Sequence, residues 1–366
     1  MVQRDVTMRR PLTPVWLAAP SRFANISQPA ARAVVALLAL LVTATLATLS
    51  TAPGHTDTAL YAMIVDGVRH GGNYYAVTAD ALRAGGYPLA PFTAFRLPTL
   101  AVIEAALPSM VVMAMLYLLA AAVAVACYGR MQPVLKMRAA QTAVALLLFA
   151  SLAPLLQPSL APLPDLWAGL AIALSLAIRR RGHYVDAIAF GVAAAVLRET
   201  AALYLIVMLS FALAERQRRE ALGWAAALIV VALVLAIHAY AVAQVVKPLD
   251  DMIFDWAGLL GFGAFVSATV SATALAWLPL GLAAPIVGLA LFGWATWRDP
   301  LALRALATIV LIALLITVFG TEETPHWALL VTPLLLTGLV FVPDGLRDLV
   351  HAALDSRRIT VTRIIR

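Results

Sequence analysis

Apolar runs long enough to cross a membrane recur through this chain, from Arg32 almost to its C-terminal end. Each run covers about 17 to 25 residues, and a helix of about 20 residues spans the hydrocarbon core of a bilayer. Hydrophobic residues make up 63% of the 366 residues and charged residues 12%, with a mean hydropathy of +0.92, which is outside the range of soluble domains. Because lipid offers no partner to backbone polar groups, the sequence predicts an all-α polytopic membrane protein.

The apolar runs predict about ten transmembrane helices. We place them at residues 32–52, 108–127, 139–156, 164–178, 185–197, 200–214, 221–243, 277–297, 301–319 and 327–342. They form a transmembrane domain at 32–342, preceded by a segment at 1–31 and followed by a tail at 343–366. The first run has no small-residue cleavage site at its end, so we expect a retained span. Residues 247–277, which are Gly-, Ser- and Thr-rich, predict an outer loop with an interfacial or re-entrant helix.

Lys and Arg predict which side of the membrane each loop faces, because they collect in short cytoplasmic loops. Placing both termini in the cytoplasm puts 21 of the 26 Lys and Arg residues on that side and leaves the outer side acidic. The formal net charge of +7 therefore reflects topology, and nucleic acid is not expected as a partner. The single cysteine, Cys127, excludes an internal disulfide framework and a cysteine metal cluster.

The stretch from Val185 to Ala214 decides the number of crossings. It is apolar for about 30 residues, which is too long for one untilted span. Basic clusters flank both of its ends. A hairpin of two short helices, with Arg198 and Glu199 in its turn, would keep both clusters in the cytoplasm. The alternative is a single tilted helix, which would place one basic cluster outside.

The longest predicted outer loop, residues 53–107, contains two short helices. From Leu60 to Val68, apolar side chains recur at helical spacing with polar ones opposite, which is typical of a helix in the membrane interface. Gly71-Gly72 ends this helix, and a second helix runs from Tyr75 to Arg83. Prolines then favour an extended path through Arg96.

A series of residues in this loop carries a family resemblance. In order, they are Asp57, Tyr61, Gly71-Gly72, Tyr74-Tyr75, Arg83, Gly86-Tyr87-Pro88 and Arg96-Leu97-Pro98. The series resembles the first extracytoplasmic loop of the GT-C superfamily of integral-membrane glycosyltransferases, which has an acidic residue after the first span, an aromatic residue shortly beyond it and a Gly-x-x-Tyr-type turn. The likeness is closest to bacterial proteins of cell-surface glycopolymer formation. Residues 191–219 and 326–333 are also similar to that group.

The resemblance implies a GT-C-like bundle that transfers a sugar at the outer face of a bacterial inner membrane. The donor would be a polyprenyl-phosphate-linked sugar, and the acceptor a hydroxyl of an envelope glycan or lipid, with inversion at the anomeric carbon. Such a reaction needs a carboxylate to remove the acceptor's proton and cations to hold the phosphate. Asp57 is the candidate base. The candidate substrate-binding residues are Arg96, Arg198, Glu199, Tyr61, Tyr75, Asp165 and His326, with Lys247 as a weaker cation.

Metal ligands are less well supported than the base. Many members of the superfamily carry two adjacent acids in this loop, whereas Asp57 has a threonine on each side. No cofactor is therefore expected, and a divalent metal stays an open alternative without support from the sequence. Glu322-Glu323 and His326 form a second polar group, but it lacks the second nearby histidine that would favour a metal site.

Each candidate residue also has a structural interpretation. Asp57 and Asp165 lie at predicted helix starts, where a carboxylate can cap free backbone amides. Arg198 and Glu199 could form a structural ion pair in which each side chain neutralises the charge of the other, although ionisable groups at membrane depth usually face a cavity or a pathway. Arg96 would reach the interface as a snorkelling side chain. Interfacial aromatic belts account for tyrosines such as Tyr74-Tyr75.

Two other functions are compatible with the pattern of polar residues. A transporter or flippase of lipid-linked sugars would use the same acids and Arg198 as an ion relay. Transporters commonly contain two similar halves, and no internal repeat is visible in the sequence, since the long outer loop has no later counterpart. A non-catalytic subunit of a glycan-assembly complex would have much the same sequence.

Overall fold

The protein is helical throughout the described part of the chain. A computed structural model describes residues 13–46, 58–251, 259–320 and 325–355. These residues form α- and 3₁₀-helices and no β-strand. The predicted all-α class is therefore confirmed. Asp57, the candidate base, lies outside the described residues, as does Glu322-Glu323.

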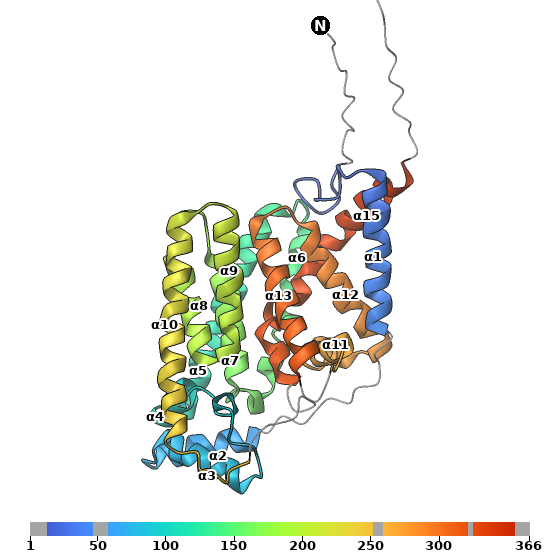
Figure 1. The fold of residues 1–366 in the computed structure, drawn as a ribbon. Helices are drawn as coiled ribbons and strands as arrows, with labels where there is room; N and C mark the ends of the chain where they lie inside the picture. Colours follow the sequence, from blue (N-terminus) through green and yellow to red (C-terminus); the bar gives the residue numbers. More distant parts are fainter. Residues whose placement is uncertain (1–12, 47–57, 252–258, 321–324, 356–366) are drawn as a thin grey trace, which may run out of the picture.

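The longer helices lie side by side in one bundle (Figure 1). Their bounds are α1 Gln28–Leu46, α5 Ser109–Met131, α6 Arg138–Ser151, α7 Pro164–Ile178, α8 Val185–Leu197, α9 Ala202–Ala214, α10 Arg218–Ala243, α12 Leu280–Thr296 and α13 Pro300–Phe319. Each of these helices overlaps one of the predicted spans, and the bounds of α7 and α8 coincide with the predicted ones. By length and composition, α1, α5, α10 and α13 are the described helices that could each cross a membrane. The total of about ten crossings stays a prediction.

The apolar stretch from Val185 to Ala214 forms two helices. The turn between α8 and α9 is a single 3₁₀ turn, η5 (Glu199–Ala201), preceded by Arg198 in an extended conformation. The two helices pack against each other and both contact α10 (Figure 1). The hairpin interpretation is therefore confirmed over one long tilted helix.

The last predicted span, 327–342, is not a continuous helix. It is replaced by η7 (Pro325–Leu330), α14 (Thr332–Leu335) and η8 (Leu336–Phe341), after which α15 (Val342–Leu354) begins. Pro333 near the start of α14 lacks the amide hydrogen that a continuing helix would need. Close backbone contact holds the broken segment in the bundle, because a Cβ on Gly169 of α7 would clash with the Leu329 carbonyl.

Other short elements lie between the longer helices along the chain. They are η1 (Phe92–Ala94), η2 (Gln132–Val134), η3 (Ala153–Leu156), η4 (Pro158–Leu160), α11 (Phe262–Ser271) and η6 (Ala274–Trp277). The predicted short helix within 247–277 corresponds to α11. This helix packs against α1, α12, α13 and η7, so it lies within the bundle.

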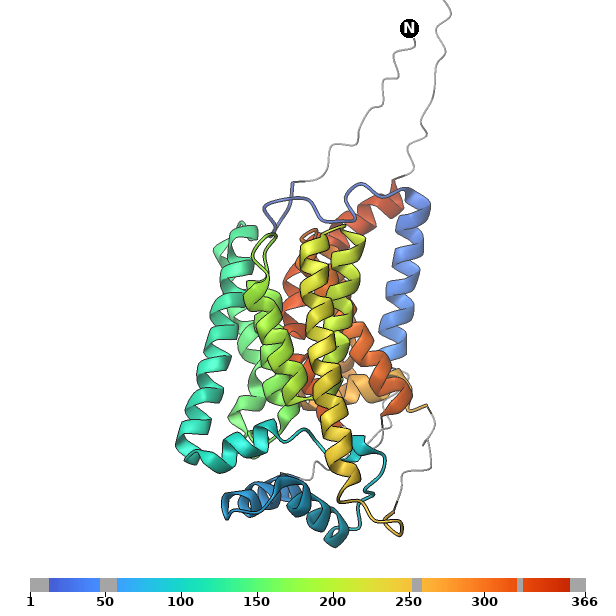
Figure 2. The same ribbon diagram turned by 60° about the vertical axis from the view of Figure 1, so that its left-hand side comes forward.

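Three helices form a platform across one end of the bundle (Figures 1 and 2). They are α2 (Thr58–Arg69), α3 (Tyr74–Ala84) and α4 (Thr99–Ala106). Asn73 caps α3 by accepting hydrogen bonds from the amides of Tyr75 and Ala76. Both short helices predicted in the first loop are therefore present, and their location in a membrane interface stays a prediction.

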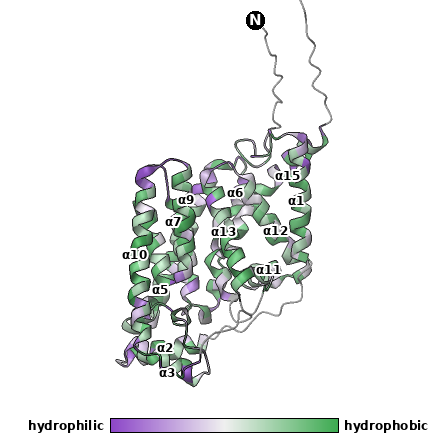
Figure 3. Ribbon diagram, viewed as in Figure 1, coloured by the Kyte–Doolittle hydropathy of each residue, from purple (hydrophilic) through white to green (hydrophobic). Residues whose placement is uncertain are grey.

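Both ends of the described chain lie at the end of the bundle opposite the platform (Figure 1). The loops with the basic clusters lie there too, as the positive-inside pattern requires of segments on one side. Figure 3 shows hydrophobic residues over the middle of the bundle and hydrophilic ones gathered towards its two ends. The arrangement is that expected of a two-sided membrane protein. Which end faces the cytoplasm stays a prediction.

An apolar groove of about 400 Å³ runs between α1 and α13, with α12 as its floor. Its walls include Leu37 and Leu41 of α1 and Leu306 and Leu314 of α13. Thr317 is the one polar residue in the lining. The lining residues of α13 extend over about 16 Å at 1.5 Å per residue, roughly half the hydrocarbon thickness of a bilayer.

Candidate functional site

Charged side chains from four segments meet inside the bundle near the platform. We call this the platform-end cluster and define it as Arg96, Asp165, Arg198, Glu199 and His326. Asp165 is in the first turn of α7, Arg198-Glu199 is in the α8–α9 turn, His326 is in η7, and Arg96 follows η1. The fold thus brings together residues that are up to 230 positions apart in the sequence (Arg96 to His326).

Arg198 is the centre of the cluster and is fully buried. Its Nε donates to Asp165 Oδ1 at 2.8 Å, and its Nη1 donates to Glu199 Oε1. Its guanidinium also lies over the ring of Trp327, 5.8 Å from the ring centroid. Removing a guanidinium from water is costly unless it is paired, and the two carboxylates supply that pairing.

Arg96 reaches the same carboxylate from the platform side. Its Nη1 lies 3.4 Å from Glu199 Oε1, and its Nε donates to the Tyr61 hydroxyl on α2 at 2.9 Å. Glu199 therefore bridges the two arginines. Arg96 is held between the platform and the hairpin turn, which differs from the free snorkelling side chain of the structural interpretation.

Asp165 links the hairpin to η7. Its Oδ2 lies 3.7 Å from His326 Nε2, which is an electrostatic contact and too long for a hydrogen bond. Its other oxygen accepts from Arg198, and Oδ2 has no hydrogen-bond partner in the described protein. Asp165 therefore does not cap α7, contrary to its structural interpretation. With a neutral His326, two arginines and two carboxylates balance in charge.

The cluster is unusual in how many of its buried atoms lack a partner. Within the described residues, half of the buried side-chain nitrogens and oxygens without a hydrogen-bond partner belong to it and its two neighbours. They are Asp165 Oδ2, Arg198 Nη2, Glu199 Oε2, Thr200 Oγ1, both His326 ring nitrogens and Trp327 Nε1. Buried polar groups are normally paired, and each exception calls for an explanation. Both donors and acceptors are represented, so the free groups cannot all be satisfied by a simple ion.

Two of the predicted residues lie apart from the cluster. The Tyr75 hydroxyl bonds to His238 Nδ1 on α10, and the backbone amide of Lys247 bonds to Asp250. Tyr61, Arg96, Asp165, Arg198, Glu199 and His326 are the predicted binding residues that the fold brings together. Asp57 precedes the first described residue of α2.

Some residues of the site were not among the predicted binding residues. Trp327 resembles any interfacial aromatic residue, and Thr200 any polar residue in a turn. His238 is a lone histidine in an otherwise apolar helix. Each acquires its role only from the packing of segments distant in sequence.

A metal site is not apparent in the described residues. No group of three or more His, Cys, Asp or Glu side chains converges there. In the platform-end cluster both carboxylates already face guanidinium groups, which oppose a cation. The expectation of no cofactor is left as a prediction.

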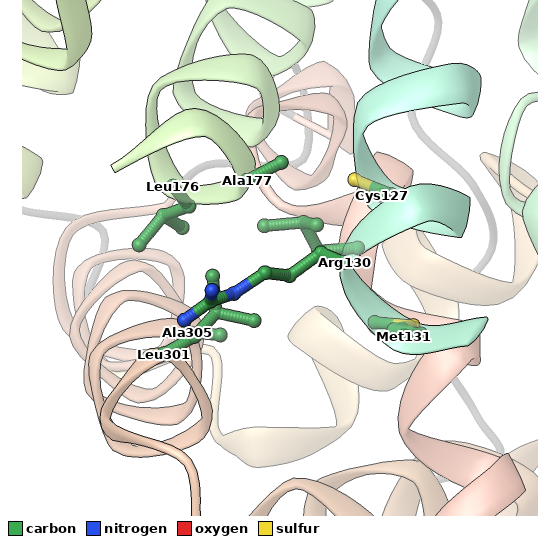
Figure 4. A pocket seen from close by; sticks show the side chains of 8 residues that line it. Cys127, Arg130, Met131, Leu176, Ala177, Leu301 and Ala305 are labelled. Atoms are coloured by element: carbon green, nitrogen blue, oxygen red, sulfur yellow. The ribbon is translucent and has the colours of Figure 1, made fainter. Parts of the chain in front are cut away.

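A second space, near the basic end, offers no comparable site. It is lined by Cys127 and Arg130 of α5 together with apolar residues of α7, α13 and α14 (Figure 4). The Arg130 side chain extends across it and pairs with Asp299 at 3.0 Å. The space is too small to admit a water-sized sphere.

Another group of buried charges lies at that end. We call it the basic-end cluster: Arg179 after α7, Glu215 after α9, Glu220 in α10 and Arg304 in α13. Arg179 donates to both oxygens of Glu220, at 2.9 and 2.7 Å. Arg304 lies 2.9 Å from Glu215 and 5.0 Å from the Phe211 ring centroid. The carboxylates of this cluster are paired within the protein.

No protein-family model, curated protein or solved structure matches this chain, so its function is inferred from its own side chains.

Proposed function

We propose that this protein is a membrane glycosyltransferase. It moves a sugar from a polyprenyl-phosphate donor to a glycan or lipid acceptor of the cell envelope, at the outer face of a bacterial inner membrane and with inversion. Asp57 is the general base. The substrate contacts come from the platform-end cluster, which would face the periplasm, with both termini in the cytoplasm.

The observation that carries the proposal is the mixture of unpartnered donors and acceptors in a charge-balanced, buried cluster. Within the described residues, Asp165 and Glu199 each keep a carboxylate oxygen without a hydrogen-bond partner, and Arg198 and Trp327 keep N–H groups without one. Neighbouring hydroxyl groups both donate and accept hydrogen bonds, so a sugar can satisfy both kinds of group at once. A lone anion would satisfy only the donors.

The two arginines fit the leaving group of such a reaction. Phosphate leaves with negative charge, and a guanidinium can stabilise that charge with charge-assisted hydrogen bonds. The Nη2 group of Arg198 has no hydrogen-bond partner among the described residues, and Arg96 lies on the platform side of the same carboxylate. Because phosphate is a good leaving group, positioning and electrostatics supply most of the rate.

Chain connectivity limits the distance of Asp57 from this cluster. Tyr61, which holds Arg96, is four residues beyond Asp57. Four residues of extended chain cover at most about 14 Å between α-carbons. A carboxylate within this reach supports the assignment of Asp57 as the group that takes the acceptor's proton.

The groove between α1 and α13 suits the lipid part of the donor. Its lining is apolar apart from Thr317, and an isoprenoid chain is also wholly apolar. Phe262 of α11 and Thr317 of α13 line the groove, and both helices pack against η7, which carries His326. A chain bound in the groove would therefore end near the platform-end cluster.

The main rival is a transporter or flippase of lipid-linked sugars. It is favoured by one observation: buried charges lie at both ends of the same helices, with Asp165 and Arg179 at the two ends of α7. Buried charges along a helix can serve as a relay. A non-catalytic assembly subunit is a further alternative, which the experiment below also separates.

The test is mass spectrometry of surface glycans and lipid-linked sugars in a deletion strain that expresses either the parent protein or Asp57→Asn at matched levels. Loss of one sugar from the glycan, with its lipid-linked donor accumulating on the outer leaflet, supports the transferase. Asp66→Asn is the matched control, because Asp66 is an exposed acid on α2 and should leave the glycan intact. A normal glycan with Asp57→Asn contradicts the proposal, and a donor trapped on the inner leaflet favours a flippase.

A further inference from the structure

The backbone that carries Arg96 is held by two side chains that bind its carbonyl groups. His238, on α10, lies with its Nε2 3.2 Å from the Phe95 carbonyl oxygen. The Tyr74 hydroxyl, on α3, donates to the Arg96 carbonyl oxygen at 2.7 Å. A bundle helix and a platform helix therefore grip two consecutive peptide groups in a segment outside regular helix.

The protonation of the His238 ring follows from its partners. The Phe95 carbonyl can only accept, so Nε2 must carry the hydrogen. In a neutral imidazole the other nitrogen is then an acceptor, and the Tyr75 hydroxyl, 3.2 Å from Nδ1, donates to it. Tyr75 thereby fixes the ring in the tautomer that can hold Phe95.

The surroundings of His238 protect these two hydrogen bonds from competition by water. The ring is 3% exposed and packs against the rings of Tyr75 and Phe92, at centroid distances of 5.6 and 6.3 Å. Val242 and Phe95 belong to the buried hydrophobic cluster beside it. With little water to compete, the carbonyl of Phe95 depends on His238 for its side-chain partner.

We propose that His238 is a positioning residue for Arg96, with Tyr75 as the group that sets its tautomer. It acts through the backbone: the position of the Phe95 carbonyl fixes where the Arg96 side chain begins. From that position the guanidinium reaches Tyr61 and Glu199 together. The assignment of Arg96 to the donor phosphate rests on the proposed function, whereas its placement by His238 does not.

The first experiment needs no ligand. Histidine labelled with ¹⁵N should give His238 the signature of the Nε2–H tautomer, and Tyr75→Phe should weaken that preference. His238→Phe keeps a ring of similar size but removes both hydrogen bonds, so amide hydrogen exchange in residues 92–98 should accelerate. His238→Gln should restore slow exchange, because its amide can donate to one partner and accept from the other. His351→Phe, an exposed position on α15, is the matched control.

The second experiment measures the affinity of the purified protein for farnesyl phosphate, a short polyprenyl phosphate. His238→Phe should weaken binding by about tenfold, since small displacements of a binding group are costly. His238→Gln should bind close to the parent value. In an Arg96→Ala background, His238→Phe should have no further effect, because the two residues act through one contact.

The outcomes distinguish the positioning role of His238 from the proposed donor class. Unchanged exchange in 92–98 with His238→Phe overturns the positioning role, and so does an equal loss of affinity in the Arg96→Ala background. Accelerated exchange, restored by His238→Gln, together with weaker binding supports it. If exchange accelerates but the parent protein does not bind farnesyl phosphate, the positioning of Arg96 is supported and the proposed donor class is contradicted.

Discussion

The two buried charge clusters have the same composition in arginines and carboxylates but differ in how the carboxylates are paired. In the basic-end cluster, Arg179 binds Glu220 through both oxygens, and Trp224 donates to the same carboxylate at 3.2 Å. In the platform-end cluster, Asp165 and Glu199 each keep one oxygen that has no hydrogen-bond partner in the described part of the chain. The first cluster satisfies its acceptors within the protein, and the second leaves them available.

This difference separates two reasons for burying charge in an apolar bundle. A group whose carboxylates are paired within the protein, as at the basic end, holds helices together, and its removal costs stability. A partly paired group is costly to retain without a ligand, so its presence points to binding. Burial of a charge alone does not distinguish a binding site from a structural ion pair. The carboxylate oxygens of Asp165 and Glu199 that lack a hydrogen-bond partner in the described residues make this distinction.

The largest effect should come from breaking the basic-end pair. Arg179→Met leaves the Glu220 carboxylate buried without its cation, which should lower the free energy of unfolding by about 3–5 kcal/mol. A denaturant titration in mixed micelles measures it. Arg180→Met, at the exposed neighbouring position, should change little. If Arg179→Met is as stable as the parent protein, the basic-end cluster does not stabilise the fold, and the contrast between the two clusters is contradicted.

The next effect concerns function at the platform end. Asp165→Asn preserves shape and leaves Glu199 to pair with Arg198, so its loss of stability should be smaller than that of Arg179→Met. Sugar transfer should fall by about 100-fold, as expected when one preorganised polar contact is lost. Glu220→Gln is the matched exchange at the basic end and should lower stability without lowering transfer per folded molecule. The reverse pattern would exchange the roles of the two clusters.

The helices of the bundle were predictable because their signal is local. Pro164 begins α7, the basic cluster at 179–181 separates it from α8, and the charged pair Arg198-Glu199 ends α8, so composition alone locates their bounds. The broken form of the last predicted span was not predictable for a physical reason: residues 327–342 are as apolar as a continuous spanning helix. Hydropathy does not register the close backbone packing at Gly338 or the interruption at Pro333.

The cluster was partly predictable for a different reason. Ionisable residues are rare at membrane depth, so Asp165 and Arg198-Glu199 were recognisable as exceptional. Their mutual pairing was not, because it depends on the arrangement of α7 against the hairpin turn. His238 was missed because its partner is a main-chain carbonyl, that of Phe95, which no residue type reveals.

The contrast between paired and unpaired carboxyls recurs at the platform end, outside the spanning helices. Arg83 binds both oxygens of Asp250, at 2.8 and 2.7 Å, and this hydrogen bonding holds the pKa of Asp250 well below its usual range. Glu104 on α4 has no such side-chain partner among the described residues. Burial raises its pKa from 4.5 to about 7, opposed only by the charge of Arg69.

These two pKa values have opposite consequences for stability. A carboxyl with a raised pKa favours folding at low pH, so the contribution of Glu104 is lost as pH rises from 4.5 through about 7. The lowered pKa of Asp250 favours folding above its unfolded value of 3.8 and is lost as pH falls. The stability of the platform should therefore be greatest at mildly acidic pH and should fall at both higher and lower pH.

The smallest predicted effect tests this at Glu104. Glu104→Gln removes the titrating group, so stability should no longer fall between pH 4.5 and about 7. The variant should gain about 1–2 kcal/mol over the parent protein at pH 8, because each pKa unit corresponds to about 1.4 kcal/mol and solvent screening at this incompletely buried carboxyl reduces the total. Amide exchange in α4 at pH 5 and pH 8 measures it. Asp250→Asn is the control, since its effect should be a general loss above pH 4. If Glu104→Gln keeps the pH dependence of the parent protein, another group causes it, and an unpaired buried carboxyl is not a reliable mark of an incomplete site.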